Sequence, residues 1–350
     1  MMMHGGGGWG RMRHLAEEQE KGGKLYDHQV VVRLMGYLRP HWRRVIAIVV
    51  LMFAYTGTVV ALPWLVKLTI DSYIGTGNLS GLNLVALAFI FVASVQFASN
   101  YLHLRLMAFV GQRVLYTLRV ELFGQLQRLS MSYYDRNEVG RVMSRVQNDV
   151  QQLQEFLTTG ILAFGDVMIL GGIVVAMLLI DAQLALITLA VLPLLFLLLF
   201  YWQGFARRAY LSVRRAIAAV NSALQENISG IRVVQGMGRE DLNLKNFDSL
   251  NMKHLITNLD ASRLSSAVLP AVEIISALAL ALVIIFGGRQ ALGGGLEVGV
   301  LVAFALYIQR FFDPIRNLTM QYTEVQRAMA SGIRIFELLD VEPEIKDAPG

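Results

Sequence analysis

Long apolar segments alternate with charged segments along most of the chain, and six of the apolar segments are long enough to cross a membrane. A membrane-spanning helix needs about 20 predominantly apolar residues. The last of the six is the weakest, because Arg310, Asp313 and Arg316 lie in its second half. The predicted spans cover residues 45–66, 84–104, 156–180, 182–206, 264–288 and 296–318. The pattern therefore predicts an all-α membrane protein with six long transmembrane helices.

Two of the charged segments continue a helical pattern beyond the predicted spans. Apolar residues recur at helical spacing over residues 106–129, and a second apolar stripe covers residues 213–228. A continuous helix over residues 84–129 would be about 69 Å long at about 1.5 Å per residue. The hydrocarbon core of a bilayer is only about 30 Å thick. We therefore expect two helical hairpins outside the membrane, with tips near residues 133–145 and 226–238.

The placement of lysine and arginine orients these spans. All but two of the 31 basic residues lie in the first 44 residues, in the two hairpins or after residue 309, and the exceptions are Lys67 and Arg289. Basic residues concentrate on the cytoplasmic side of membrane proteins. Both termini and both hairpins are therefore predicted to be cytoplasmic.

Composition agrees with a membrane protein and excludes some kinds of site. Hydrophobic residues make up 55% of the chain and charged residues 16%, whereas a soluble domain has about 25% charged residues. The positive charges alternate with apolar runs and form no single basic face, which argues against nucleic acid as a partner. The absence of cysteine excludes disulfides and thiolate metal sites. Residues 1–29 are rich in glycine and charge and are predicted to be a disordered cytoplasmic tail.

Residues 129–150, with Tyr134, Asp135, Gly140, Ser144, Arg145 and Asp149 at characteristic spacing, form one of three recognisable segments, and residues 224–240 and 331–347 form the others. In this order they resemble segments of the transmembrane domain of exporter-type (type IV) ABC transporters. Residues 129–150 resemble the first intracellular loop of that family, residues 224–240 the second, and residues 331–347 the connector to the nucleotide-binding domain. The family often has serine or threonine before the glycine of the first loop, where this chain has Val139. The resemblance extends over about residues 30–347. In the first loop it rests on Tyr134, Asp135, Gly140, Ser144, Arg145 and Asp149.

This resemblance implies a transmembrane domain over residues 30–336 and a connector over residues 337–350. Two such domains, identical or different, would pair around a central cavity, with spans four and five crossing to the partner half. Coupling helices at the hairpin tips would dock on two ATPase domains. Turn and capping chemistry alone would also suit Gly140 and Gly230. The residues that the resemblance places in coupling are Tyr134, Asp135, Glu138, Gly140, Arg141, Ser144, Arg145, Glu226, Gly230 and Arg232.

The chain contains no Gly-x-x-x-x-Gly-Lys-Ser/Thr segment, the motif that binds nucleotide phosphates. We therefore expect no enzymatic activity and no cofactor in this chain, with Mg-ATP bound by a nucleotide-binding domain outside it. That domain is either a separate polypeptide or the continuation of a longer chain. The connector-like sequence over residues 331–347 favours the continuation.

Five polar residues inside the predicted spans are candidates for a substrate cavity. An ionisable side chain at the bilayer centre costs about 2.5–3.5 kcal/mol on insertion scales unless it pairs or faces water. Glu273 therefore contacts either substrate or a neighbouring helix, and Asp166 and Arg310 could pair with each other. Gln96 and Asn100 lie one turn apart, and the favoured role for their amides is hydrogen bonding between helices. The candidates are Gln96, Asn100, Asp166, Glu273 and Arg310.

The leading hypothesis is thus the membrane-spanning translocation subunit of an ATP-driven exporter in the plasma membrane. It would couple ATP hydrolysis by a cytoplasmic ATPase domain to efflux of a drug, lipid or peptide by alternating access. A six-span secondary transporter is one alternative, but such proteins have short inner loops and often inverted repeats with broken helices. A membrane scaffold that binds a cytoplasmic partner without transport is the other alternative.

Overall fold

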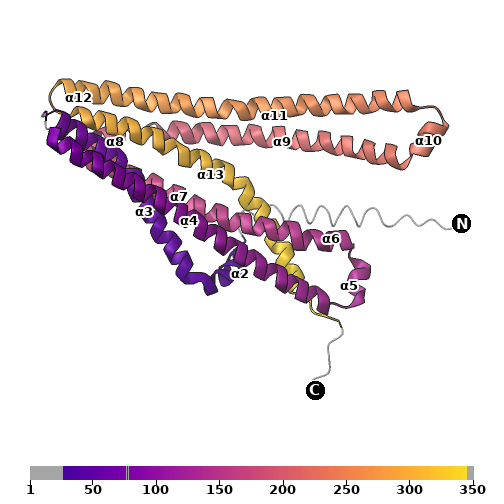
Figure 1. Ribbon diagram of the computed structural model, residues 1–350. Helices are drawn as coiled ribbons and strands as arrows, with labels where there is room; N and C mark the ends of the chain where they lie inside the picture. The colour runs from indigo at the N-terminus through magenta and orange to yellow at the C-terminus, as the bar shows by residue number, and fades with distance from the viewer. Residues whose placement is uncertain (1–26, 76, 78, 345–350) are drawn as a thin grey trace, which may run out of the picture. The chain divides into compact units, whose positions relative to one another are not determined.

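The computed structural model describes residues 27–75, 77 and 79–344, and the chain divides into two compact units (Figure 1). Unit 1 consists of Met1–Ile180 with Val298–Gly350, and unit 2 consists of Asp181–Glu297. No strand occurs among the described residues. Within the described part of the chain, six helical segments are long and apolar enough to cross a membrane, which confirms the predicted all-α architecture with six spans.

Unit 1 is built from four long helices and several short ones. Its long helices are α3 (Trp42–Leu68), α4 (Leu79–Arg128), α7 (Val150–Ile180) and α13 (Val298–Leu339). α13 packs against α7 and α3, and α4 packs against α3 and α7. The shorter elements are α2 (His28–Leu38), the 3-10 turn η1 (Arg39–His41), the π-helical turns η2 (Thr69–Ile74) and η3 (Arg145–Asp149), α5 (Met131–Arg136) and α6 (Val139–Ser144).

α4 is one continuous helix of 50 residues, about 75 Å long, so it extends well beyond a bilayer as predicted. Its predicted apolar stripe is buried at Val110, Val114, Leu118 and Leu122. These side chains join a core that includes Leu34 of α2 and residues of α7 and α13. Burial of this stripe keeps the part of α4 beyond the predicted span helical and attached to unit 1, because an isolated helix has little stability in water.

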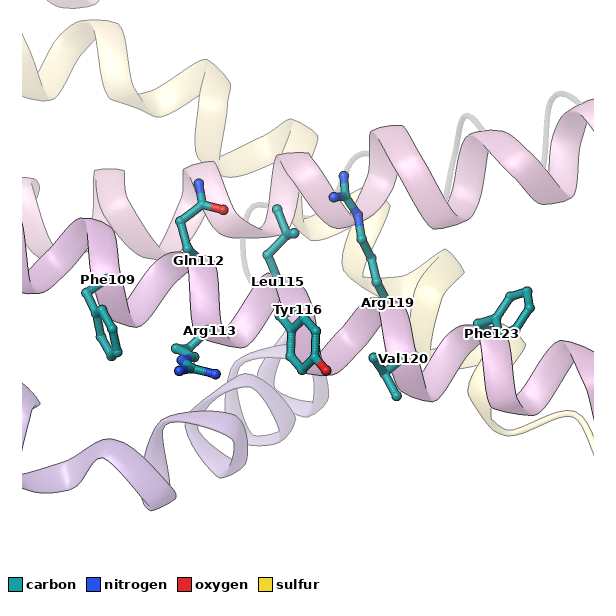
Figure 2. A pocket seen from close by; sticks show the side chains of 8 residues that line it. All are labelled: Phe109, Gln112, Arg113, Leu115, Tyr116, Arg119, Val120 and Phe123. Carbon is teal, nitrogen blue, oxygen red and sulfur yellow. The ribbon is translucent and has the colours of Figure 1, made fainter.

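A second face of α4 is hollowed in the same region (Figure 2). The hollow has a volume of about 620 Å³ and is lined by aromatic, apolar and arginine side chains. Tyr116, Val120 and Phe123 are each more than half exposed there, although they lie beyond the predicted second span. The lining residues are Phe109, Gln112, Arg113, Leu115, Tyr116, Arg119, Val120 and Phe123.

Unit 2 is a hairpin of two long helices, α9 (Leu192–Ser229) and α11 (Glu240–Leu282), which lie side by side in Figure 1. The indole N–H of Trp202 donates a hydrogen bond to the carbonyl of Leu264, 3.1 Å away, and so joins the two helices. The remaining elements are α8 (Ala182–Leu189), α10 (Ile231–Gly236), the π-helical turn η4 (Val283–Gly287) and α12 (Gly288–Leu292).

The predicted fourth span is not one helix, because α8 ends at Leu189 and α9 begins at Leu192. Pro193 lies in the first turn of α9, where its missing N–H leaves no hydrogen bond unmade, and it cannot continue α8. Of the predicted tail, residues 1–26 lie outside the described residues, and His28 already begins α2, with the Asp27 side chain capping that helix.

Candidate coupling site

The tip of the first hairpin consists of α5 and α6, two helices of six residues each between α4 and η3. The hydroxyl of Tyr134 donates a hydrogen bond to the carbonyl of Leu126, 2.6 Å away. The side-chain amide of Asn137 donates to the carbonyl of Tyr133 at 2.9 Å, and the rings of Tyr133 and Tyr134 meet edge to face. These contacts fix the angle between the tip and the end of α4.

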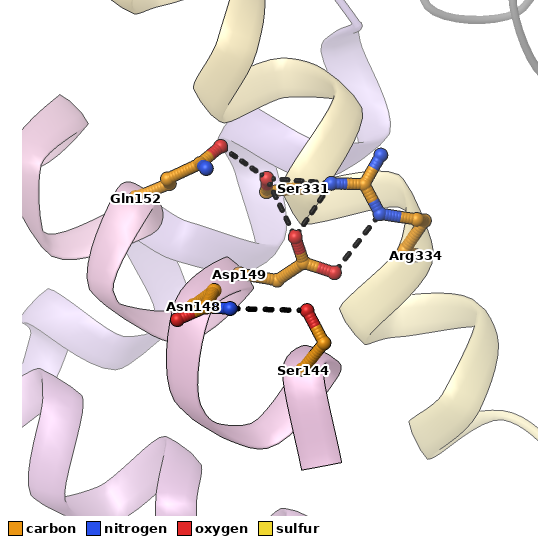
Figure 3. A network of polar contacts seen from close by, with 6 residues as sticks. All are labelled: Ser144, Asn148, Asp149, Gln152, Ser331 and Arg334. Carbon is orange, nitrogen blue, oxygen red and sulfur yellow. Dashed lines mark hydrogen bonds and ion pairs between the residues drawn. The ribbon is translucent and has the colours of Figure 1, made fainter. Parts of the chain in front are cut away.

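An ion pair joins η3, which leads from the hairpin tip into α7, to α13 (Figure 3). The guanidinium of Arg334 donates to both carboxylate oxygens of Asp149, at 2.9 Å from Nε and 2.5 Å from Nη2. The Ser331 hydroxyl lies 3.0 Å from Asp149 and 2.7 Å from the amide oxygen of Gln152, and it accepts a bond from Arg334. Ser331 is fully buried, and the Asp149 side chain is only 8% exposed.

The π-helical turn η3 places Asp149 in this position. Such turns insert an extra residue into a helix and are frequent at functional sites. Asp149 is the last residue of this turn and its carboxylate reaches α13, while Asn148 donates back to the Ser144 hydroxyl at 3.1 Å. A buried carboxylate requires a partner, and a bidentate arginine is the strongest one available to it. The first hairpin and the end of α13 are therefore joined as one body.

The chain that follows α13 lies along α2 and α4. Arg33 binds the Asp340 carboxylate through two hydrogen bonds, at 2.5 and 2.8 Å. The side-chain amide of Gln125 donates to the carbonyl of Val341 at 2.6 Å. The hydrogen bond from Arg33 holds the pKa of Asp340 below its ordinary value. Residues 340–341 are therefore attached to both helices.

The same segment also reaches the tip of the first hairpin. Ser132 of α5 donates a hydrogen bond to the Glu344 carboxylate at 2.5 Å, and Arg136 pairs with it at 3.1 Å. The Ser132 hydroxyl, followed by the charge of Arg136, lowers the pKa of Glu344. The described part of the predicted connector is thus in contact with the predicted coupling tip.

The tip of the second hairpin, in unit 2, is α10. The amide of Gly230 donates to the carbonyl of Glu226 at 2.9 Å, which closes α9 before the tip. Gly238 has a φ of +59°, a left-handed conformation that suits glycine, and it leads into α11. Several large apolar side chains are exposed around this tip. They are Ile228, Ile231, Val233 and Met237.

The ten predicted coupling residues all lie in or beside the two tips, and most have exposed side chains. Arg145 is half-buried, and its guanidinium lies 3.4 Å from the Tyr133 hydroxyl. Arg334 and Ser331 were not among the predicted site residues, although both lie in the segment that resembles the connector. Among the ten predicted coupling residues, the exposed ones are Asp135, Glu138, Gly140, Arg141, Ser144, Glu226 and Arg232.

The five candidate cavity residues are divided between the units. Four lie in unit 1, where Gln96 and Asn100 are half-buried on α4. Asp166 lies 3.4 Å from the side-chain amide of Asn317, and the Arg310 guanidinium lies 3.5 Å from the carbonyl of Val59, both within unit 1. The fifth, Glu273, is on an exposed position of α11 in unit 2.

A family model described as the ABC transporter transmembrane region matches residues 45–315. An uncharacterized ABC transporter ATP-binding protein of Bacillus subtilis is 32% identical, over 93% of this chain and 54% of the relative. An ATP-dependent lipid A-core flippase of Syntrophus aciditrophicus is 28% identical, over 90% of this chain and 53% of the relative.

A further relative, a putative multidrug export ATP-binding/permease protein of Staphylococcus aureus, is 28% identical over 92% of this chain and 57% of its own length. The chain therefore spans about half the length of the curated relatives that it matches.

Proposed function

This chain belongs to the ABC transporter transmembrane family and is a multi-pass membrane protein, and from that premise we propose that it is the translocation subunit of an ATP-driven exporter. ATP with Mg²⁺ would be bound and hydrolysed by a nucleotide-binding domain, and this chain would convert that cycle into alternating access. The relatives named above include a lipid flippase and a multidrug exporter. With these names as support, we propose that this chain moves an amphipathic or apolar compound.

The contacts of the first hairpin are the observation that carries this proposal. The Asp149–Arg334 pair joins the hairpin to α13, and Glu344 joins the segment after α13 to the hairpin tip. A push on the tip or a pull on the connector would therefore reach the same two membrane helices, α7 and α13. A secondary transporter or a scaffold has no need for this connection.

Both tips would dock on ATPase domains on the cytoplasmic side of the plasma membrane. The exposed apolar residues around α10 support this role for the second tip, because a surface of that kind is covered in an assembled complex. Arg141 and Arg232, one on each tip, add exposed positive charge. With six spans, an even number, the segments before the first span and after the last lie on the same side, which under this proposal is the cytoplasm.

A second transmembrane half, identical or different, would complete the translocation pathway. The exposed side chains of Tyr116, Val120 and Phe123, at the end of the hollow farther from the predicted span, support such a partner, since they lie 12 or more residues beyond residue 104. In the family, spans four and five cross to the partner half. The unit 2 hairpin of that half is therefore the proposed occupant of α4 around residues 116–123.

A distance measurement tests the coupling mechanism in the complete transporter, with its ATPase domains present. Spin labels on R141C or, separately, on R232C would report the distance between the two copies in a homodimer. We expect this distance to shorten when ATP and vanadate are added, and to remain unchanged when the phosphate-binding lysine of the ATPase domain is replaced. Proteoliposomes that move a fluorescent lipid or dye with an ion gradient but without ATP would overturn the proposal in favour of a secondary transporter.

A further inference from the structure

Three arginines directly precede the first predicted span, and a fourth approaches them from α4. Arg39 begins η1, and Arg43 and Arg44 lie in the first turn of α3, immediately before residue 45. The guanidinium carbon of Arg44 lies 4.4 Å from the centre of the Phe109 ring, and that of Arg113 lies 5.4 Å from the same ring. One aromatic ring on α4 therefore contacts a guanidinium group from each of two helices.

These guanidinium groups are not neutralised by acidic side chains. In the part of the chain that the structure describes, no carboxylate pairs with any of them, although Arg33 and Arg334 each bind an aspartate. The nearest polar neighbour recorded for Arg44 is the imidazole of His41, at 3.5 Å. All four arginines are exposed. The cluster is therefore a concentration of positive charge available to an anion.

The predicted spans place this cluster at the level of the membrane surface. Trp42 is 57% exposed, and the Arg43 guanidinium lies 5.6 Å from its ring. Exposed tryptophan beside the end of a span is typical of the headgroup region. Arg113 is nine residues past the end of the second predicted span at residue 104, about 13 Å along the helix, and a long arginine side chain can reach back toward the surface.

We propose that Arg43, Arg44 and Arg113, held in place by Trp42 and Phe109, bind the headgroup phosphate of an anionic phospholipid. The planar guanidinium donates paired hydrogen bonds that match phosphate oxygens. Contact with an aromatic face limits the freedom of each guanidinium before the lipid binds. An anionic headgroup is favoured over a zwitterionic one, whose ammonium group would meet the same positive charges. The site rests on the position of the first two spans and does not depend on export.

Trp42 itself provides the probe for this site. The full 350-residue chain with W9F, W64F and W202F retains Trp42 as its only tryptophan. In nanodiscs of phosphatidylcholine, a minor fraction of brominated phosphatidylglycerol should quench Trp42 more strongly than the same fraction of brominated phosphatidylcholine. Because both leaflets have the same composition, the result does not depend on which side is cytoplasmic. Failure here would leave the exporter proposal intact, and failure of ATP-driven transport would leave this site intact.

Substitutions distinguish a specific lipid-binding site from a general effect of positive surface charge. R44Q should weaken the preference for the anionic lipid roughly fivefold, and the triple variant R43Q/R44Q/R113Q by more than about tenfold. R44K should lie between wild type and R44Q, because lysine keeps the charge and loses the planar fork. Circular dichroism should show unchanged helicity, since these side chains are exposed.

The matched control removes three exposed arginines beside the fourth span, in the triple variant R207Q/R208Q/R214Q. It should leave the lipid preference unchanged. An equal loss in both triple variants would overturn the proposal, because the preference would then come from the overall charge of the protein. Displacement of the lipid by excess inorganic phosphate would also overturn it, since the ligand would then be a free anion.

Discussion

The two hairpin tips differ in how many of their side-chain contacts are made within this chain. The tip formed by α5 and α6 is held by a buried ion pair behind it and by the segment after α13. The tip formed by α10 exposes Ile231 and Val233, and in the described structure none of its side chains hydrogen-bonds to a residue outside the unit 2 hairpin. The first tip therefore takes its conformation from contacts within its own unit. The second presents the surface that an ATPase domain would cover.

Because of this difference, substitutions at the two tips should change different properties, the stability of the chain at one and its binding to the ATPase domain at the other. A buried ion pair often adds little net stability compared with an apolar pair, but removing one partner leaves an uncompensated charge. Substitutions behind the first tip should therefore lower the free energy of unfolding. Substitutions on the second tip should leave the isolated chain stable and lower its affinity for the ATPase domain.

Loss of the Asp149 carboxylate should have the largest effect on unfolding. D149A leaves Arg334 and Ser331 without their shared acceptor, and we expect a loss of about 2–3 kcal/mol. The value is placed below that of a fully buried pair because the Arg334 side chain is 39% exposed. Thermal unfolding in detergent micelles measures it. The control E226A on α9 should change the free energy of unfolding by less than about 0.5 kcal/mol. Equal shifts for the two variants would remove the distinction between the tips.

Polar substitution of the second tip should weaken binding without affecting folding. The double variant I231S/V233S removes two exposed apolar side chains, each contributing about 1 kcal/mol if it is buried by the ATPase domain. The affinity for that domain should fall by at least about tenfold, as measured by fluorescence titration, with an unchanged unfolding temperature. M252S, which removes an exposed apolar side chain from α11 away from the tip, is the matched control. Unchanged affinity in the double variant would show that this tip is not a docking surface.

Ser331 allows a smaller test of the same network. S331A removes a hydroxyl that is fully buried between Asp149 and Gln152 but leaves the ion pair in place. The free energy of unfolding should fall by about 1 kcal/mol, the usual effect of one buried hydrogen bond. S249A on α11 removes an exposed hydroxyl bonded to a nearby carbonyl and should have almost no effect. A larger loss for S331A than for D149A would mean that the hydroxyl, and not the charge pair, fixes α13.

Sequence periodicity was sufficient to predict the long helices and the positions of both tips. The apolar residues from Val110 to Leu122 recur with the period of a helix, and this period predicts that they form one buried face. The partner of Asp149 could not be predicted in this way, because Arg334 is 185 residues away and many other arginines were equally available. The π-helical turn that aims Asp149 also has no clear sequence signal. The break between α8 and α9 could have been expected from Pro193, which marks the first turn of a new helix.

The smallest effect expected is a dependence of the connector contact on pH. The pKa values of Asp340 and Glu344 lie below their ordinary values of 3.8 and 4.5. A lowered carboxyl pKa means that the contact stabilises the folded state above the ordinary value and loses this contribution as pH falls through the lowered one. Both side chains are more than half exposed, so water screens the pairs and only the connector should loosen. A spin label on P343C should therefore become more mobile as the pH falls below 3.8, the lower of the two ordinary values. The variant D340N/E344Q should already be mobile at neutral pH and should show no further change on acidification. A wild-type label that stays immobile well below both ordinary pKa values would show that other contacts, such as the bond between Gln125 and Val341, hold the connector to the first hairpin.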